Sequence, residues 1–315
     1  MPSLLVRSGS NWVPEKGIYV MQGGSWQRKM GYVYVNGQWV PLSSGPIIIT
    51  SKHLTGVAYG NGLWVTVGYD GTILTSTDGI SWASRTSGTS LNLFDVAYGN
   101  GLWVTVGYAG VIRTSTNGTS WTSSSKDKPN PDNVNGVAYG NGLWVAVGYG
   151  GKIHTSTNGT WWTVLSSDKP DSLYDVAYGN GRWVAVGISG TILTSTDGNS
   201  WTSRSFPTSA DLRGVAYANG LWVAVGSKGT ILTSTNGTSW TLRSSGTSAN
   251  LWGVAYGNGL WVAVGDGGAI LTSTNGTSWT SRTSGTSANL NGVAYGDGLW
   301  VAVGHDGTVL TFAIS

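Results

Sequence analysis

The stretch GVAYGNGLWVAVG at residues 136–148 decides the fold, because the chain contains seven copies of it with few changes. The valine before each Ala-Tyr pair marks the copies, and successive valines are 39, 41, 39, 39, 39 and 39 residues apart. A fixed period of this length is typical of an array in which each unit packs on its neighbours. We therefore expect one domain of seven similar units. The marker valines are Val57, Val96, Val137, Val176, Val215, Val254 and Val293.

The fourth copy illustrates how one unit is expected to fold. Four short segments, at residues 174–178, 183–187, 191–196 and 201–205, are separated by glycine-containing reversals. Their β-branched and aromatic residues predict strands, and Gly or Asn-Gly at a reversal favours a tight antiparallel turn. A helix is excluded because the glycines interrupt any apolar pattern with a period of about 3.6 residues. Four antiparallel strands make one blade, so the sequence predicts an all-β, seven-bladed β-propeller.

The turn between the third and fourth strands carries a second recurring phrase, STDGISW or STNGTSW in most copies. Here a short Asp or Asn side chain can accept backbone N–H bonds, glycine takes a positive φ, and tryptophan packs over the hairpin. The phrase resembles the Asp box, Ser-x-Asp-x-Gly-x-x-Trp, with the glycine one place earlier and asparagine often replacing aspartate. The array resembles the BNR/Asp-box propellers, among them the sialidases and the photosystem II assembly-factor type of repeat protein. The phrase occupies Ser76–Trp82, Ser115–Trp121, Ser156–Trp162, Ser195–Trp201, Ser234–Trp240 and Ser273–Trp279.

The seventh unit lacks a fourth strand, because the sequence stops at Thr308–Ser315. The N-terminal stretch Trp39–Gly45 aligns with Trp82–Gly88 of the first unit. We therefore expect this stretch to supply the outer strand of the last blade. Closing the ring in this way removes the unpaired sheet edges of an open array. The prediction divides the chain into an extension, residues 1–38, and a propeller, residues 39–315.

The extension has a pattern of its own. Three short phrases end in Trp12, Trp26 and Trp39, and turn pairs such as Asn36-Gly37 interrupt alternating residues, which predicts β-hairpins. The phrase YVYVNGQW resembles short repeats of phage tail and other virion proteins. This resemblance implies that residues 1–38 attach the propeller to a larger assembly or oligomerise, with other virion or tail proteins as partners.

Charge and composition exclude several classes of function. The formal net charge of +3 divides into +4 for residues 1–52, with five basic residues against Glu15, and −1 for the rest, with 12 basic and 13 acidic residues. Such a balance gives the array no basic face for nucleic acid. The absence of cysteine excludes disulfides and thiolate metal sites. No apolar run predicts a signal peptide or a membrane span, so we expect synthesis in the cytoplasm, with virion association open.

The resemblance to sialidases implies a catalytic set of an arginine cluster, a tyrosine nucleophile, a glutamate and an acidic aspartate. This chain departs from that set. Its only glutamate is Glu15, and four arginines share one position on the outer strand. The Asp-box carboxylates alternate with asparagine, which indicates a folding role. The same turns account for the Asn-Gly-Thr sequons. We expect no enzyme activity and no cofactor. The four arginines are Arg85, Arg204, Arg243 and Arg282.

The histidines and the repeated tryptophans are candidates for a metal site and for sugar stacking, respectively. His53, His154 and His305 are scattered single residues, so we expect no metal site, and His154 is interpreted as a packing variant of a strand leucine. Thirteen tryptophans recur, seven at the start of the second strand and six in the Asp boxes. They could stack on sugars, but residues that every copy keeps favour blade-to-blade packing.

The copies differ in two places, immediately before and after the constant phrase. Because strands alternate in direction, both places should lie on one face of the ring, together with the only length change, in the connection at residues 123–135. Neutral drift of exposed loops is one explanation. The set is rich in aromatic, Arg, Asn and Asp residues, which favours a binding site. The candidate ligand-binding residues before the phrase are Phe94, Asn135, Tyr174, Arg213, Trp252 and Asn291, in a series that begins with Thr55. Those after it are Tyr69, Asp70, Tyr108, Tyr149, Lys228, Asp266, His305 and Asp306.

The leading hypothesis is non-enzymatic recognition of a glycan or cell-surface receptor by a phage tail or virion-associated propeller, without membrane insertion. Aromatic rings stack on the C–H faces of sugars while nearby amides and hydroxyls bind their hydroxyl groups. A protein-interaction scaffold, as the assembly-factor resemblance implies, is a second hypothesis. An amplified or engineered symmetric propeller without a ligand is a third.

Overall fold

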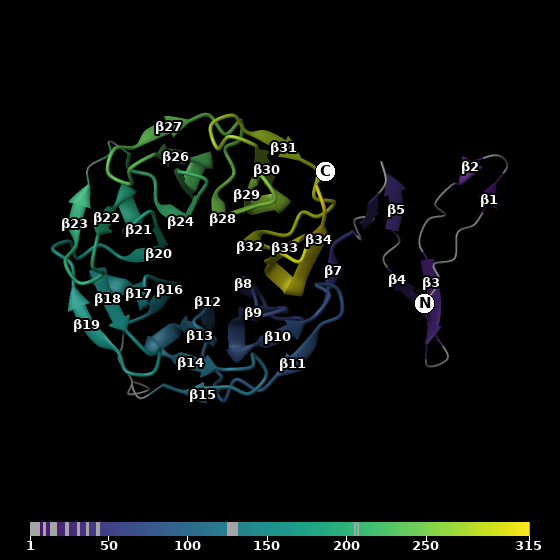
Figure 1. Ribbon diagram of the computed structural model, residues 1–315, viewed down its shortest axis with the longest axis horizontal. Coiled ribbons are helices and arrows are strands. Elements are labelled where there is room, and N and C mark those ends of the chain that lie inside the picture. The colour runs from purple at the N-terminus through teal and green to yellow at the C-terminus, as the bar shows by residue number, and fades with distance from the viewer. Residues whose placement is uncertain are drawn as a thin grey trace.

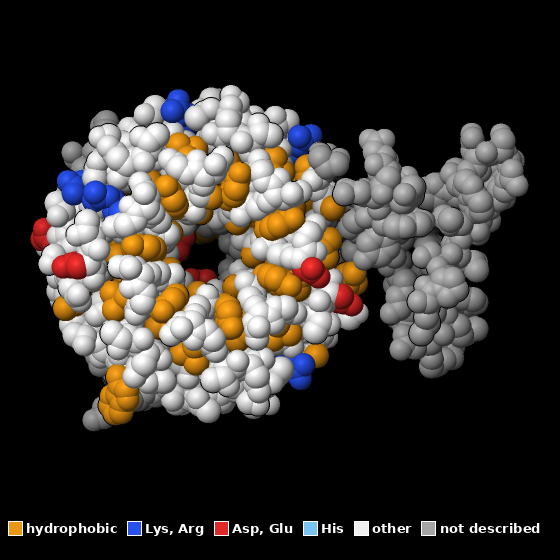
Figure 2. All heavy atoms as spheres, in the orientation of Figure 1, with side chains coloured by type: hydrophobic (Ala, Val, Ile, Leu, Met, Phe, Trp, Pro, Cys, Tyr) orange, Lys and Arg blue, Asp and Glu red, His pale blue; other side chains and the backbone are white. Residues whose placement is uncertain are grey.

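The structure is a computed structural model that describes residues 45–124, 132–204, 206 and 208–314, together with six short strands before residue 45. The described chain forms a closed ring of seven four-stranded antiparallel sheets (Figure 1). The space-filling view in Figure 2 shows an opening at the centre of the ring. In six blades the four strands follow chain order from the centre to the outer edge, and in the seventh the N-terminal strand β7 takes the outer place. The predicted all-β, seven-bladed propeller is therefore confirmed.

The strands occupy equivalent positions in every blade. The first strands, beside the central channel, are β8 (Leu54–Gly60), β12 (Leu93–Gly99), β16 (Val134–Gly140), β20 (Leu173–Gly179), β24 (Leu212–Ala218), β28 (Leu251–Gly257) and β32 (Leu290–Gly296). The second strands are β9 (Leu63–Gly68), β13 (Leu102–Gly107), β17 (Leu143–Gly148), β21 (Arg182–Gly187), β25 (Leu221–Gly226), β29 (Leu260–Gly265) and β33 (Leu299–Gly304). The third strands are β10 (Ile73–Ser76), β14 (Ile112–Ser115), β18 (Lys152–Ser156), β22 (Ile192–Ser195), β26 (Ile231–Ser234), β30 (Ile270–Ser273) and β34 (Thr308–Phe312).

The outer strands are shorter. They are β11 (Ala83–Arg85), β15 (Thr122–Ser123), β19 (Thr163–Ser166), β23 (Thr202–Arg204), β27 (Thr241–Arg243), β31 (Thr280–Arg282) and, in the seventh blade, β7 (Ile47–Ile48). A one-turn 3-10 helix joins the second strand to the third in each blade. These turns are η1 (Tyr69–Gly71), η2 (Tyr108–Gly110), η3 (Tyr149–Gly151), η4 (Ile188–Gly190), η5 (Ser227–Gly229), η6 (Asp266–Gly268) and η7 (His305–Gly307).

An N-terminal strand closes the ring, as predicted, but it is a different strand from the one expected. Ile47 of β7 pairs with Val309 in the position that Arg85 takes opposite Ile73 in the first blade. Trp82 precedes Arg85 by three residues, whereas Trp39 precedes Ile47 by eight. The expected outer strand at Trp39–Gly45 was therefore wrong. Trp39 instead lies in β6 (Gln38–Pro41), which pairs with β5 (Tyr32–Val35).

Two further hairpins precede that pair. β1 (Arg7–Ser8) pairs with β2 (Asn11–Trp12), and β3 (Ile18–Gln22) pairs with β4 (Ser25–Lys29). All three pairings are antiparallel, which agrees with the β-hairpins expected from the sequence. The attachment or oligomerisation role of residues 1–38 stays a prediction.

The core lies between blades, because each blade packs its face on the next. At the second junction, Val104 and Ile112 of one blade contact Trp144 and Trp162 of the following blade. The seven tryptophans that begin the second strands are at most 1% exposed. Each packs against the tyrosine of its own first strand, with ring centroids 4.8–5.0 Å apart. The interpretation of these tryptophans as packing residues is confirmed. They are Trp64, Trp103, Trp144, Trp183, Trp222, Trp261 and Trp300.

The glycines that end the first and second strands allow close approach between neighbouring segments. A Cβ atom at Gly148 would lie 2.0 Å from the carbonyl oxygen of Asn133, which precedes the first strand of the same blade. A Cβ atom at Gly140 would lie 2.4 Å from the ring of Tyr178 in the next blade. The overlap at Gly148 is with a backbone carbonyl, and all seven copies keep glycine at that position. The position of Gly140 is less strict, because the fifth copy carries Ala218 there.

The Asp-box turns are held by their own side chains. In the fourth blade, Oδ1 of Asp197 accepts N–H bonds from Asn199 and Ser200 at 2.8 and 2.7 Å, and a hydroxyl bond from Ser195 at 2.9 Å. Asn236 makes the same three contacts in the fifth blade. These bonds hold the pKa of Asp197 well below its usual range, at about 2. The Asp-box carboxylates are therefore turn acceptors, as the sequence indicated.

We predict that Gly148→Ala destabilises the protein by more than about 3 kcal/mol, because the added methyl group meets a backbone carbonyl that cannot move without opening the blade. Gly45→Ala is the matched control, since no atom lies within 4 Å of its Cβ position. Urea unfolding followed by tryptophan fluorescence measures both variants. A loss of less than about 1 kcal/mol for Gly148→Ala would contradict the proposed packing constraint.

We predict opposite changes in acid stability for Asp197→Asn and Asn236→Asp. The folded-state pKa of Asp197, about 2, lies below its unfolded value of 3.8, so its contribution is present above about pH 4 and is lost as the pH falls towards 2. Asp197→Asn should reduce the loss of folding stability between about pH 4 and pH 2, and Asn236→Asp should increase that loss by a similar amount. Denaturation midpoints at pH 2, 3, 4 and 7 test this. Parallel pH profiles for both variants and the parent protein would refute it.

Candidate ligand-binding face

Antiparallel strands place the connections of each blade on two opposite faces of the ring. One face carries the nearly constant Asp-box turns. The other carries the η turns and the connections between blades, and it holds all the predicted binding residues; we call it the variable face. Its inner row, the second residue of each first strand, is Thr55, Phe94, Asn135, Tyr174, Arg213, Trp252 and Asn291. Its turn row, the first residue of each η turn, is Tyr69, Tyr108, Tyr149, Ile188, Ser227, Asp266 and His305.

A recurrent hydrogen bond ties six of the seven η turns to the blade that follows. At one junction, Oδ1 of Asn250 accepts the backbone N–H of Lys228 at 2.9 Å; at another, His53 Nδ1 accepts the N–H of Asp306 at 2.9 Å. We call these acceptors the junction residues. These residues were not among the predicted binding residues, although six of the seven copies have an Asn, Asp or His directly before the leucine or valine of the first strand. They are His53, Asn92, Asn133, Asp211, Asn250 and Asn289.

The middle residue of every η turn has a left-handed φ angle, and in six of the turns its N–H also makes this junction bond. Asp70, Lys228 and Asp306 have left-handed φ angles of 54°, 56° and 53°. Their side chains are exposed, and Asp70 forms an ion pair with Lys52. The junction bonds use only the backbone N–H of these three predicted residues. Their side chains are therefore presented to solvent from a rigid turn.

Part of the inner row joins blade to blade. The Asn135 and Asn291 amides each donate a 2.7 Å bond to a carbonyl of the next blade, at Leu173 and Leu54 respectively. The Thr55 hydroxyl makes the equivalent 2.8 Å bond. The amide N–H groups of these two predicted binding residues are thus already used within the ring. Phe94 lies half-buried in the same row.

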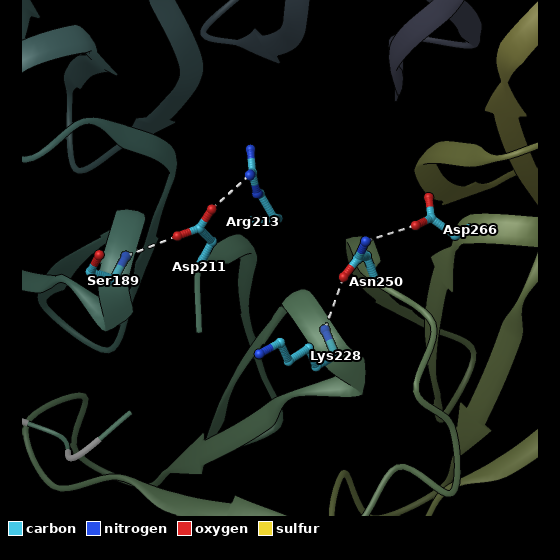
Figure 3. Close-up of polar contacts among 6 residues, drawn as sticks. All are labelled: Ser189, Asp211, Arg213, Lys228, Asn250 and Asp266. Atoms are coloured by element: carbon cyan, nitrogen blue, oxygen red, sulfur yellow. Dashed lines mark hydrogen bonds and ion pairs between the residues drawn. The ribbon is translucent and has the colours of Figure 1, made fainter. Parts of the chain in front are cut away.

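Three consecutive inner-row residues form a stacked group across the fourth, fifth and sixth blades. The Arg213 guanidinium carbon lies 4.0 Å from the Tyr174 ring centroid and 5.0 Å from that of Trp252. Arg213 also pairs with Asp211 at 2.7 Å, so its charge is balanced where it is partly buried (Figure 3).

Asp266 of the turn row completes this group. Its carboxylate accepts bonds from Trp252 Nε1 at 2.6 Å and from the Asn250 amide at 2.8 Å. Figure 3 shows Asn250 between Lys228 and Asp266, bonded to both. The structure therefore brings together Tyr174, Arg213, Trp252 and Asp266, which the sequence had proposed only as separate members of a variable set.

The turn row presents a second aromatic group on the first three blades. Tyr69, Tyr108 and Tyr149 are 40%, 50% and 59% exposed. They occupy equivalent positions on consecutive η turns, and we call them the tyrosine arc. The repeated tryptophans, in contrast, are nearly all buried or half-buried. Aromatic surface available to a ligand on the variable face is therefore concentrated in this arc.

Ring closure brings two of the histidines together, so the interpretation of His53 and His305 as isolated residues was wrong. Their ring centroids are 4.4 Å apart, and His53 also packs edge-on against Tyr69 at 5.2 Å. Burial, followed by the charge of His53, lowers the pKa of His305. His154 is buried in β18, as its interpretation as a packing variant requires.

Two acidic residues lie on the channel wall, directly after the inner row. Asp95 accepts the N–H groups of Val96 and Val137 at 2.8 and 2.9 Å. Asp175 accepts those of Val176 and Val215 at 2.7 and 2.8 Å. Acidic side chains are visible inside the opening in Figure 2. Burial in the ring raises the pKa of both carboxyls, and the charge of Asp95 raises the pKa of Asp175 further.

The described residues hold no arrangement typical of a sialidase. The outer-strand arginines Arg85, Arg204, Arg243 and Arg282 each donate Nε–H to a threonine hydroxyl on the neighbouring strand at 2.8–2.9 Å, away from the channel. Within residues 45–124, 132–204 and 208–314, no three His, Asp or Glu side chains are placed to hold a metal ion. No helix in this part of the chain is long and apolar enough to cross a membrane.

The chain matches no family model and no curated protein in sequence. Solved structures share its fold. YCF48 bound to D1 peptide has a TM-score of 0.72 at 19% identity, over 91% of this chain and 98% of that one. An inactive virginiamycin B lyase from Staphylococcus aureus with quinupristin has a TM-score of 0.76 at 12% identity, over 87% and 99%. The computationally designed Ika8 protein has a TM-score of 0.62 at 13% identity, over 85% and 98%. The chain is thus similar in fold to a peptide-bound protein, a lyase and a designed propeller.

We predict that the pH dependence of stability between about pH 4 and 7 depends on Asp95 and Asp175. Their folded-state pKa values are raised above the unfolded value of 3.8, so the stability associated with the protonated forms is present below about pH 4 and is lost as the pH rises towards 7. The double variant Asp95→Asn/Asp175→Asn should flatten this slope. Asp211→Asn, which changes a carboxylate outside the channel, is the control. An unchanged slope in the double variant would refute the assignment.

Proposed function

We propose that the protein is a non-enzymatic recognition module that binds a glycan on its variable face. The observation that carries the proposal is the tyrosine arc, three exposed rings in equivalent positions on rigid turns of adjacent blades. Aromatic side chains are usually buried, and an exposed group of them on one face marks an interaction site. The surrounding Asp70, Lys52 and His53 supply hydrogen-bonding groups at one end of the arc.

Carbohydrate suits this arrangement because a pyranose ring offers a C–H face for stacking and hydroxyl groups at its edge. A chain of sugars can place successive residues on successive blades. The stacked group of Tyr174, Arg213 and Trp252 offers a second, more polar surface nearer the channel. The N-terminal resemblance to phage tail repeats supports a place in a tail or virion, where residues 1–38 would attach the propeller and the variable face would meet a host-cell glycan.

The non-enzymatic part of the proposal rests on the use of the polar residues. In the described chain, the Asp-box acids bond turn backbone and Asp95 and Asp175 bond strand N–H groups. The strand arginines bond threonine hydroxyls. Retaining or inverting glycoside hydrolysis needs a pair of carboxyl groups facing one substrate bond. The variable face presents aromatic and amide groups for binding instead.

A protein-interaction scaffold is the second candidate. The similarity in fold to YCF48 bound to D1 peptide favours it, because that protein holds a peptide on the same architecture. A peptide would use the same aromatic and charged groups, so direct comparison of sugar and protein ligands must separate the two. The similarity to a designed propeller supports the third possibility, a symmetric repeat without a ligand.

We predict that Tyr108→Ala/Tyr149→Ala reduces glycan binding and adsorption to host cells at least about tenfold, the loss expected from about 1.4 kcal/mol of ring contact. Trp161→Ala is the matched control. Trp161 is 71% exposed but lies in an Asp-box turn on the opposite face, so its removal should change neither. The measurements are a glycan array with the labelled full chain and a cell-adsorption assay.

Each outcome decides between the candidates. Binding to defined glycans that depends on the tyrosine pair supports the proposal. Capture of a stable protein partner, with no glycan bound and with the same dependence on Tyr108 and Tyr149, favours the scaffold. Equal behaviour of the two variants and the parent protein in all assays would reject a binding role for the tyrosine arc.

A further inference from the structure

The channel wall has seven equivalent backbone N–H groups, one at each marker valine. Four of them are bonded to carboxylates of the chain. Asp95 bridges the valines of the second and third blades, and Asp175 bridges those of the fourth and fifth. Each carboxylate therefore spans two neighbouring blades. Two such bridges use four of the seven N–H groups and leave three, at Val57, Val254 and Val293.

These three N–H groups point the same way as the bridged ones. Val137, which donates to Asp95, pairs with Ala146 of the second strand, two residues after a register shift at the start of the first strand. Val57, Val254 and Val293 have the same register after the same shift. Residues in the same register of an antiparallel pair direct their backbone N–H groups to the same side of the strand, which is here the side that faces the channel. The three valines belong to the sixth, seventh and first blades, which are consecutive around the ring (Figure 1). No side chain of the described residues accepts a bond from them.

Exposure separates the two sets of valines. The four bridged valines are 3–4% exposed, whereas Val57 and Val293 are 9% and 8% exposed and Val254 is half-buried. The residue before each open valine is glycine, at Gly56, Gly253 and Gly292, in the position that Asp95 and Asp175 occupy elsewhere. Glycine removes both the carboxylate and the side-chain volume, so the wall is more open on this side.

We propose that the backbone N–H groups of Val254, Val293 and Val57 form a binding site for a carboxylate group of a ligand that enters the channel from the variable face. The chain itself provides the template, since the same pair of N–H groups from adjacent blades binds the Asp95 and Asp175 carboxylates at 2.7–2.9 Å. Hydrogen bonds from backbone N–H to an ionised acceptor are among the stronger ones in proteins. The site lies one residue beyond the inner row and does not require the tyrosine arc to bind anything.

The glycines show that a carboxylate can reach this site. A Cβ atom at Gly292 would lie 3.4 Å from the Val57 nitrogen, and one at Gly253 would lie 3.5 Å from the Val293 nitrogen. Aspartate at either position would therefore be placed like Asp95, next to the N–H of the following blade. Gly253→Asp and Gly292→Asp should fill the site from within, while Gly253→Ala adds the Cβ atom and leaves the N–H groups open.

Asp95 and Asp175 oppose a third negative charge in the channel. Asp175 belongs to the fourth blade, across the ring from the open valines, whereas Asp95 belongs to the second blade, which adjoins that of Val57 (Figure 1). A Cβ atom at Gly56 would lie 3.2 Å from Oδ1 of Asp95, so Asp95 is the nearer of the two charges. Burial raises the pKa of both carboxyls, so at pH 5.5 they carry less charge than at neutral pH. A test at pH 5.5 keeps this repulsion low while most of the acetate probe stays ionised.

The experiment measures thermal unfolding of the full chain at pH 5.5 in sodium acetate and in sodium chloride of equal ionic strength. The parent protein and Gly253→Ala should gain about 2 °C or more from acetate over chloride, as expected for a ligand at several times its Kd. Gly253→Asp and Gly292→Asp should lose at least half of that gain. Acetamide, which has no carboxylate, should give no gain in any variant.

A variant that removes Asp95 tests whether free acetate can replace a carboxylate that the chain itself places between two valine N–H groups. Asp95→Gly removes the bridge between Val96 and Val137, which should lower the unfolding midpoint, and acetate should restore more of it than chloride does. Sodium glucuronate and N-acetylglycine, used separately, then show whether a sugar acid or a peptide C-terminus stabilises the parent protein more. An equal effect of the two assigns recognition to the carboxylate alone.

The proposal is overturned if acetate raises the midpoint of the parent protein, Gly253→Ala and Gly253→Asp equally, since such a rise would be a general salt effect. If neither aspartate variant folds, an acetate-soaked crystal of the parent protein decides. Density within hydrogen-bonding distance of the Val293 nitrogen and one neighbouring valine nitrogen supports the site, and its absence rejects it. Failure here leaves the glycan proposal untouched, because the tyrosine variants test a different surface.

Discussion

Packing of one blade's second-strand tryptophan against the preceding blade is the interaction on which the ring depends. A single four-stranded sheet of this size cannot bury both of its faces, so each blade is stable only between two neighbours. The seven tryptophans, at most 1% exposed, fill that space together with the valines of the adjacent blade. Each copy of the repeat must therefore fit the copy before it and the copy after it. This double constraint explains why the constant phrase changes so little and why most of the variation lies before and after it.

The sequence was sufficient to predict the features of the fold that recur in every repeat. Period, glycine reversals and the Asp-box turns predicted the blade, and the seven copies predicted the ring. The position of the closing strand was not predictable in the same way. The strand that pairs with the last blade, Ile47–Ile48, belongs to no recurring phrase, whereas Trp39 does. The contact between His53 and His305 was missed for a related reason, because it exists only once the two ends of the array meet.

The candidate site shows how a repeat can diverge without losing its fold. Junction residues such as Asn250 bind the backbone of the preceding turn, so the side chain on that turn is free to vary. The result is an uneven face, with exposed tyrosines on three blades, a stacked group around Arg213 on the next three, and histidines at the closing junction. Candidate residues could be named from the sequence, but their division into these groups could not, because it depends on which blades are neighbours. Asn135 and Asn291 illustrate the limit, since their amides hold carbonyls of the next blade.

Closure by a two-residue strand has a mechanical consequence. Ile47 and Ile48 pair with Val309 and Thr308 near the C-terminus, and everything before residue 45 is connected to the ring through this strand. A pulling force applied through the N-terminal segment therefore acts first on the two pairs of β7 and the adjoining bond from the Ile49 N–H to the Gly307 carbonyl. In the other six blades the four strands are consecutive in the chain. The pairing of β7 with β34, which closes the ring, is therefore the contact that we expect to break first under tension. Once β7 separates from β34, the seventh blade loses its outer edge and the ring becomes an open array with two ends.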